Sequence, residues 1–129
     1  MAEKDRNKVV YVIGAYRAPD EITLFGNIMR ARRVAEELWV RGYIPLCPHL
    51  NSAFMGGLVP DKRFLEGGII LLERCDAFAV VDGFENSEGS RAEIEHALAI
   101  GKEFVPTRAG VADLHYIQSV INMGACGNG

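Results

Sequence analysis

Hydrophobic residues along the chain occur in short runs that alternate with longer helical repeats. Residues 8–14 form a short apolar run that ends in glycine, which is typical of a buried strand in a parallel sheet. Over residues 20–41 the apolar positions Leu24, Ile28, Ala31, Ala35 and Leu38 recur at helical spacing, and Gly42 follows as a C-cap. The chain therefore begins with a strand and a long helix.

The rest of the chain repeats this alternation. Further strands are predicted at 43–47, 76–81 and 103–106, and further helices at 61–74, 91–100 and 111–122. Residues 49–60 carry two glycines and no periodicity, which predicts a loop that is long for so small a domain. Residues 86–89 predict a turn, and 1–7 and 124–129 are expected to be loose ends.

Alternating strands and helices predict one α/β domain over residues 1–129. We expect a Rossmann-like parallel sheet of four to five strands, with the first strand in the middle and helices on both faces. Ligands of such sheets bind beyond the carboxyl ends of the strands. That rule selects two segments, residues 14–20 after the first strand and residues 82–90 after the third.

Composition narrows the class of protein. The chain has 129 residues, of which 49% are hydrophobic and 24% charged, as in globular proteins, and its net charge of -3 argues against a nucleic-acid polymer as partner. The sequence contains no apolar run of membrane-spanning length and no signal-peptide core, so we expect a cytoplasmic protein without a membrane partner. Three cysteines (Cys47, Cys75 and Cys126) lack metal-ligand spacing, and we expect reduced thiols and no metal.

The first of the two segments contains a glycine and an arginine. Gly14 allows a tight turn at the end of the strand, and Arg17 follows where its planar guanidinium could hold a phosphate or carboxylate. The alternative is an ordinary strand-to-helix turn with a solvated arginine.

The second segment ends in a serine and a glutamate at capping distance. Ser90-x-x-Glu93 has the form of a capping box, in which both side chains satisfy backbone amides at a helix start and need no further function. The functional alternative is that the positive end of the helix dipole keeps Glu93 ionised, as a nucleophilic carboxylate requires.

Taken together, four motifs resemble a known family. They are Tyr11-x-x-Gly14, Cys75-Asp76, Ser87-x-Gly89-x-x-x-Glu93 and Ala97-x-x-x-Gly101-Lys102. Their order and spacing over residues 8–106 resemble the nucleoside 2-deoxyribosyltransferase superfamily, which includes the 2'-deoxynucleoside 5'-phosphate N-hydrolases, and in particular a small bacterial and phage branch of it.

The resemblance implies roles for four residues. Glu93 would be the nucleophile that attacks C1' of a (deoxy)ribose, and Tyr11 would position it. Arg17 and Ser87 would hold a 5'-phosphate. The implied activity is cleavage or transfer of an N-glycosidic bond in a nucleoside or nucleoside 5'-monophosphate, without a cofactor. Relatives are dimers or larger, so a homodimer or larger assembly is expected.

The sequence departs from the family pattern at three positions. Gly68 stands where the family usually has an aspartate that protonates the leaving base. Ala15 replaces a serine of the hydrolases' first loop, and Arg91 occupies a position that is often glycine. The proton donor of the implied reaction is therefore not identified by the resemblance.

Several further residues are candidates for the substrate site. Gly14, Asp82, Gly89 and His49 are expected at the crevice, since each belongs to or follows a segment at the carboxyl end of a strand. Loop aromatics and apolar residues that could stack on a base are Phe54, Met55 and Phe84, although such residues more often close the core. His96 is expected to pack or to lie in an interface, and Asp76 to be structural.

Two other functions stay open at this point. A protein with the crevice but without the acid would be a catalytically silent nucleotide-binding module. A protein in which Glu93 only caps a helix would be an oligomeric structural or interaction domain.

Overall fold

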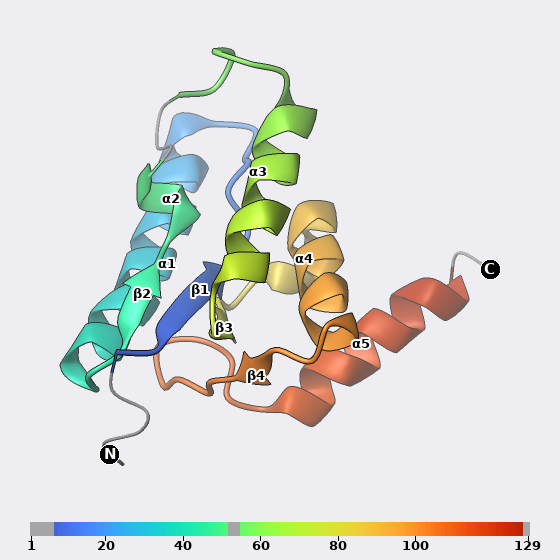
Figure 1. Cartoon of the computed structure of the whole chain (residues 1–129). Coiled ribbons are helices and arrows are strands. Elements are labelled where there is room, and N and C mark those ends of the chain that lie inside the picture. The colour runs from blue at the N-terminus through green and yellow to red at the C-terminus, as the bar shows by residue number, and fades with distance from the viewer. Residues whose placement is uncertain (1–6, 52–54, 128–129) are drawn as a thin grey trace.

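The computed structural model describes residues 7–51 and 55–127 and contains one sheet of four strands (Figure 1). The strands are β1 (Val9–Ile13), β2 (Ile44–Leu46), β3 (Ala77–Val80) and β4 (Glu103–Phe104), in the order β2-β1-β3-β4. All three pairings between neighbours are parallel. The predicted parallel α/β sheet with the first strand in its interior is confirmed.

Helices cover both faces of this sheet. Successive side chains of β1 point to opposite faces and pack in two different cores. Val10 and Val12 pack in one core with α1 (Glu21–Val40), whereas Tyr11 and Ile13 pack in the other. The second core also takes buried residues from α3 (Asp61–Arg74), α4 (Glu88–Ala99) and α5 (Leu114–Gly127). Figure 1 shows α1 and α3 on opposite sides of β1.

The first two long helices form where the sequence predicts them. The side chain of Asp20 caps α1 by accepting a hydrogen bond from Thr23 N at 2.7 Å. Helix α3 continues through Gly67 and Gly68 despite the low helix propensity of glycine. Lys102 donates from Nζ to the carbonyl oxygens of Glu73 at 3.0 Å and Cys75 at 2.6 Å, and so satisfies orphan carbonyls where α3 ends.

The connection between β2 and α3 differs from the predicted loop. A short helix α2 (Pro48–Asn51) occupies its start, and Phe54, a candidate for base stacking, lies outside the described residues. Met55 belongs to the described part and is exposed.

The last two helices begin at other residues than predicted. Instead of a turn at 86–89, the short 3-10 helix η2 (Phe84–Asn86) leads directly into α4 at Glu88. Helix α5 begins at Leu114 rather than 111, because Val111 N still donates a hydrogen bond to Val80 O at 2.9 Å, next to the end of β3. Since α5 continues to Gly127, it also includes most of the tail that was expected to be loose. None of the helices in the described part has the length and hydropathy needed to cross a membrane.

Candidate active site

A tyrosine of β1 and a glutamate of α4 meet beneath α3. The hydroxyl of Tyr11 donates a hydrogen bond of 2.5 Å to Oε2 of Glu93. Tyr11 is 1% exposed, and its position in β1 directs its side chain into the core that contains α3 and α4. The predicted contact between these two residues is therefore present.

Gly68 of α3 covers this pair from above. A Cβ atom at Gly68 would lie 2.7 Å from Oε2 of Glu93 and 2.8 Å from the hydroxyl of Tyr11, closer than real Cβ contacts. The neighbouring Gly67 has no atom within 4 Å of the corresponding position. Only glycine at residue 68 thus allows the backbone of α3 to lie against the Tyr11–Glu93 pair.

Burial determines the electrostatics of the pair. It raises the pKa of Glu93 to about 7, although the hydrogen bond from Tyr11 acts in the opposite direction. Burial, and after it the charge of Glu93, also raise the pKa of Tyr11. The pKa of Glu93 therefore lies near neutral pH, while Tyr11 keeps its proton and remains the donor.

The capping-box interpretation of Ser90 and Glu93 is wrong. Ser87 is the N-cap of α4, and its Oγ accepts a hydrogen bond from Ser90 N at 3.2 Å. Glu93 is consequently the sixth residue of the helix, beyond the first turn in which capping and the helix dipole act. Glu93 is not a cap, and the dipole does not explain its ionisation.

Among the described residues, no hydrogen bond or ion pair joins the other candidate site residues to the Tyr11–Glu93 pair. Ser87 and Gly89 lie at the start of α4, where Ser87 is the cap. Arg17 is exposed and forms an ion pair with Asp61 at the start of α3. Asp82 is also exposed, in the segment that follows β3. These four residues lie on the two segments, 14–20 and 82–90, that the sequence predicts at the ligand-binding edge of the sheet. That Arg17 and Ser87 share a pocket with the pair stays a prediction.

His49 joins two neighbouring loops, and Gly14 allows β1 to end close to Val81. The ring of His49 is 5% exposed, its Nε2 lies 3.0 Å from Ala15 O, and it meets the Tyr16 ring edge-on at 5.6 Å between centroids. Burial lowers the pKa of His49, so the ring is neutral at neutral pH. A Cβ at Gly14 would come within 2.7 Å of Val81 Cβ, which explains a glycine at the end of β1. His49 therefore ties the segment after β2 to the segment after β1.

Three other residues have structural roles. Asp76 accepts a hydrogen bond from Val9 N at 2.9 Å, as the structural interpretation of this residue predicts. His96 forms an ion pair with Glu73 at 3.2 Å. Phe84 is fully buried and meets the Tyr116 ring edge-on, so it closes the core rather than lying open to a base.

The main residue that sequence reasoning missed is Gly68. The sequence marks it only as a position where the family usually has an aspartate, and not as a contact of the pair. The signal in the sequence was a glycine pair inside an otherwise regular helix, since such a glycine often marks a close backbone approach. Ser90 was misread as a cap, and its buried hydroxyl has no hydrogen-bond partner among the described residues.

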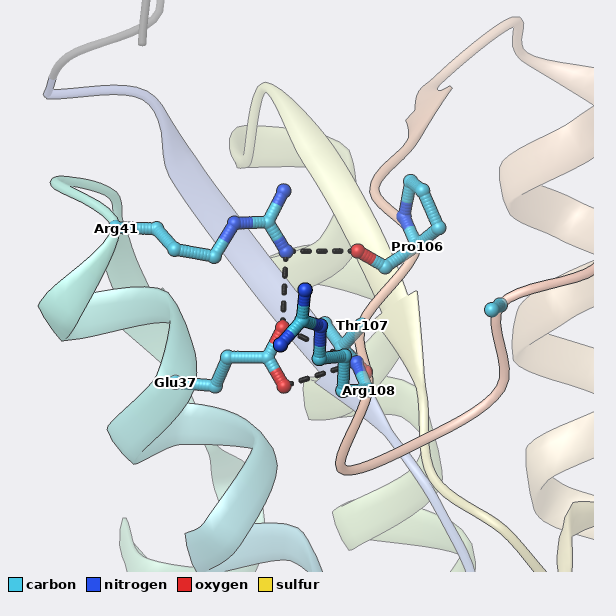
Figure 2. Close-up of a pocket in the computed structure, with 6 residues that line it drawn as sticks. Glu37, Arg41, Pro106, Thr107 and Arg108 are labelled. Atoms are coloured by element: carbon cyan, nitrogen blue, oxygen red, sulfur yellow. Dashed lines mark hydrogen bonds and ion pairs between the residues drawn. The ribbon is translucent and has the colours of Figure 1, made fainter.

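A separate surface pocket lies beside the end of α1 (Figure 2). Its lining includes Glu37, Arg41 and the segment after β4 from Pro106 to Arg108, but not Tyr11 or Glu93. Glu37 accepts hydrogen bonds from Arg108 N and Ala109 N, each at 2.9 Å, and from Arg41. Because these polar groups bind one another, we interpret the pocket as a structural contact that holds the segment after β4 to α1. We call this set of hydrogen bonds around Glu37 the clasp.

The fold and the Tyr11–Glu93 pair define a parallel α/β domain with a largely buried carboxyl group whose pKa is raised. No set of side chains in the described ranges has the arrangement of a metal site. Over residues 8–106 the chain matches a family described as a domain of unknown function (DUF7768), and it belongs to that family. A comparison with curated proteins gave no match.

Proposed function

We propose that the protein cleaves or transfers the N-glycosidic bond of a nucleoside or nucleoside 5'-monophosphate, with Glu93 as nucleophile. The observation that carries the proposal is the buried contact between Glu93 and the Tyr11 hydroxyl. A buried carboxylate whose partner is a neutral donor, rather than a cation, keeps its charge available for a reacting centre. The resemblance in sequence agrees with this chemistry.

The proposed reaction has two steps, as in retaining glycosidases. A carboxylate oxygen of Glu93 attacks C1' of the sugar, and the base departs through a transition state with oxocarbenium character. Water or an acceptor base then attacks C1' and releases Glu93. Tyr11 fixes the rotamer of Glu93 through Oε2 in both steps, which leaves Oε1 for C1'.

A 5'-phosphate would bind at the start of α4 and at Arg17. Backbone amides at a helix N-terminus attract anions, and Ser87 adds a hydroxyl there. Arg17 already holds the carboxylate of Asp61, which a phosphate would replace. Because exposed ion pairs contribute only about 0–1 kcal/mol, this exchange costs little. Gly14, His49, Asp82 and Gly89 would shape the rest of the crevice.

Assembly into a homodimer or larger, in the cytoplasm, is part of the same proposal. Helix α1 exposes Ile22 and Phe25, which are 86% and 57% accessible. Large apolar side chains so exposed are suited to an interface. Light scattering at micromolar concentration tests this, and a monomer would contradict it.

The test of activity is release of free base from nucleosides and their 5'-monophosphates, followed by chromatography. Glu93→Gln should abolish release while binding is retained. Glu95→Gln is the matched control, because Glu95 is an exposed residue of the same helix. If nucleotides raise the melting temperature of the wild type and no base is released, a silent binding module is the better description.

A further inference from the structure

The surroundings of Glu93 restrict the chemistry of the base that can leave. A neutral base departs with an electron pair that makes its ring nitrogen anionic unless an acid protonates it, and such acids typically contribute about 10²–10⁴-fold to rates. A base that is already cationic departs as a neutral molecule and needs no proton. Whether this site can release a neutral base therefore depends on whether a described residue can protonate it.

No described side chain near Glu93 is suited to be that acid. On the α3 side, residue 68 has no side chain, and Glu93 and Tyr11 occupy the space that a Cβ atom there would enter. The Tyr11 proton is committed to Oε2 of Glu93, and burial makes it harder to remove. His49 is buried, neutral and bonded to Ala15. Within the described ranges, the pKa of Glu93 responds to burial and to Tyr11, and to no other titratable group.

The other ionisable side chains of α3 and α4 have partners elsewhere or face solvent, except Arg91, whose buried Nε has no hydrogen-bond partner among the described residues. The pairs are Asp61 with Arg17, Glu66 with Arg63, and Glu73 with His96, and Glu95 is exposed. Arg91 is two residues from Glu93, which places it about 200° around the helix and on another face. Among the residues that the structure describes, Glu93 therefore has no neighbouring side chain suited to protonate a leaving base.

We propose that the substrate of this site is an N-glycoside whose base already carries a positive charge, such as a pyridinium or an N7-alkylated purine. The proposal rests on the proposed function and names its substrate class. The charge of such a ring also favours the ionised form of a buried carboxyl group, so the substrate itself activates the nucleophile. Exposed Asp82 and Glu88 add negative charge to the segment after β3.

The reaction balances without a proton donor. A bond forms between a Glu93 oxygen and C1', the bond from C1' to the ring nitrogen breaks, and its electron pair neutralises the ring. Water then gives its hydroxide to C1' and its proton to solvent, and the ester bond returns its electron pair to Glu93. Nothing is oxidised or reduced.

The experiment compares two nucleotides that differ in one methyl group and one charge. Base release is measured from 7-methylguanosine 5'-monophosphate and guanosine 5'-monophosphate, with nicotinamide mononucleotide as a second cationic probe, and uncatalysed rates are subtracted. We expect kcat/KM for both cationic probes to exceed that for guanosine 5'-monophosphate by about 100-fold or more, the usual contribution of a missing acid. The pH profile for nicotinamide mononucleotide, whose pyridinium ring carries no ionisable proton, should have one rising limb, from Glu93, and no falling limb.

The outcomes separate this inference from the proposed function. If guanosine 5'-monophosphate is cleaved within tenfold of its methylated form and Glu93→Gln abolishes both activities, the proposed function stands and the charge requirement is overturned. A falling limb in the profile for nicotinamide mononucleotide also overturns it, because the ring of this probe does not titrate and the limb then reveals an acid of the protein. If no probe releases base, or if Glu93→Gln is as active as the wild type, the proposed function fails and this inference fails with it.

Discussion

The hydroxyl of Tyr11 lies 2.5 Å from Oε2 of Glu93, beneath a turn of α3 that comes close only because residue 68 is glycine. This arrangement buries a carboxyl group beside a neutral donor, and burial raises the pKa of Glu93 to about 7. A structural carboxylate is normally stabilised by cations or by several amides, which lower its pKa. Ionisation of Glu93 at high pH should therefore lower the free energy of unfolding, which can be measured.

Glu93→Gln should stabilise the protein at high pH. Because the folded pKa of Glu93 lies above its ordinary value of 4.5, the folded state binds the proton more tightly, and wild-type stability falls as pH rises from about 4.5 through 7. The loss is on the order of 1–3 kcal/mol. The glutamine variant lacks this titration, so its advantage in urea unfolding should grow from pH 4 to pH 8. Glu95→Gln should follow the wild type, and an advantage of the wild type at pH 8 would contradict our account of Glu93.

Tyr11→Phe should raise the pKa of Glu93 further. The Tyr11 hydrogen bond lowers this pKa against the effect of burial, and phenylalanine keeps the ring while removing the donor. The carboxyl resonance of Glu93, followed by NMR, should titrate at a higher pH in the variant than in the wild type. The rising limb of kcat/KM should move in the same direction. Tyr16→Phe, which changes a tyrosine of the following segment, is the control and should leave the midpoint in place.

Gly68→Ala and Gly67→Ala should have opposite effects. Alanine is favoured over glycine inside a helix by about 1 kcal/mol, so Gly67→Ala, which meets no atom within 4 Å, should stabilise the protein. At Gly68 the new methyl group would overlap Glu93 and Tyr11, and overpacking of this kind typically costs about 1–3 kcal/mol. We expect Gly68→Ala to unfold at lower urea and to shift the titration of Glu93. Equal stabilisation by both substitutions would show that α3 does not cover the pair.

The sequence was sufficient for the topology and for the meeting of Tyr11 and Glu93. Strand β1 is a short apolar run with alternating faces, so Tyr11 had to lie on one face of the sheet, and the resemblance to a known family implied that Glu93 lies beside it. The glycine pair in α3 marked an unusual position in the helix, but the contact of Gly68 with the pair could not be located, because periodicity assigns faces to a helix but not its distance from a neighbour. The cap of α4 was misassigned because Ser87 and Ser90 are both good N-cap residues, and only the path of the preceding backbone selects Ser87. The clasp at Glu37 joins residues about seventy positions apart, and no local pattern marks such a contact.

That clasp gives a prediction independent of the active site. Burial opposes ionisation of Glu37, but the amides of Ala109 and Arg108 and the side chain of Arg41 outweigh it and lower the pKa of Glu37. Its stabilising effect is therefore present above the ordinary pKa of 4.5 and is lost as pH falls below that value toward the folded pKa. Glu37→Gln should cost on the order of 1–2 kcal/mol at pH 7, since hydrogen bonds to a charged group weaken when the charge is removed and the site is partly solvated.

The same substitution should cost less at low pH, where the wild-type carboxyl is itself protonated. Urea unfolding at pH 7 and at pH 3.5 measures the difference between variant and wild type, and we expect it to narrow in acid. Glu36→Gln is the matched control, because Glu36 is an exposed neighbour in α1, and its substitution should change stability little at either pH. If the cost of Glu37→Gln is the same at both pH values, the ionised carboxylate is not what holds the segment after β4 to α1, and packing around Ala109 must do so instead.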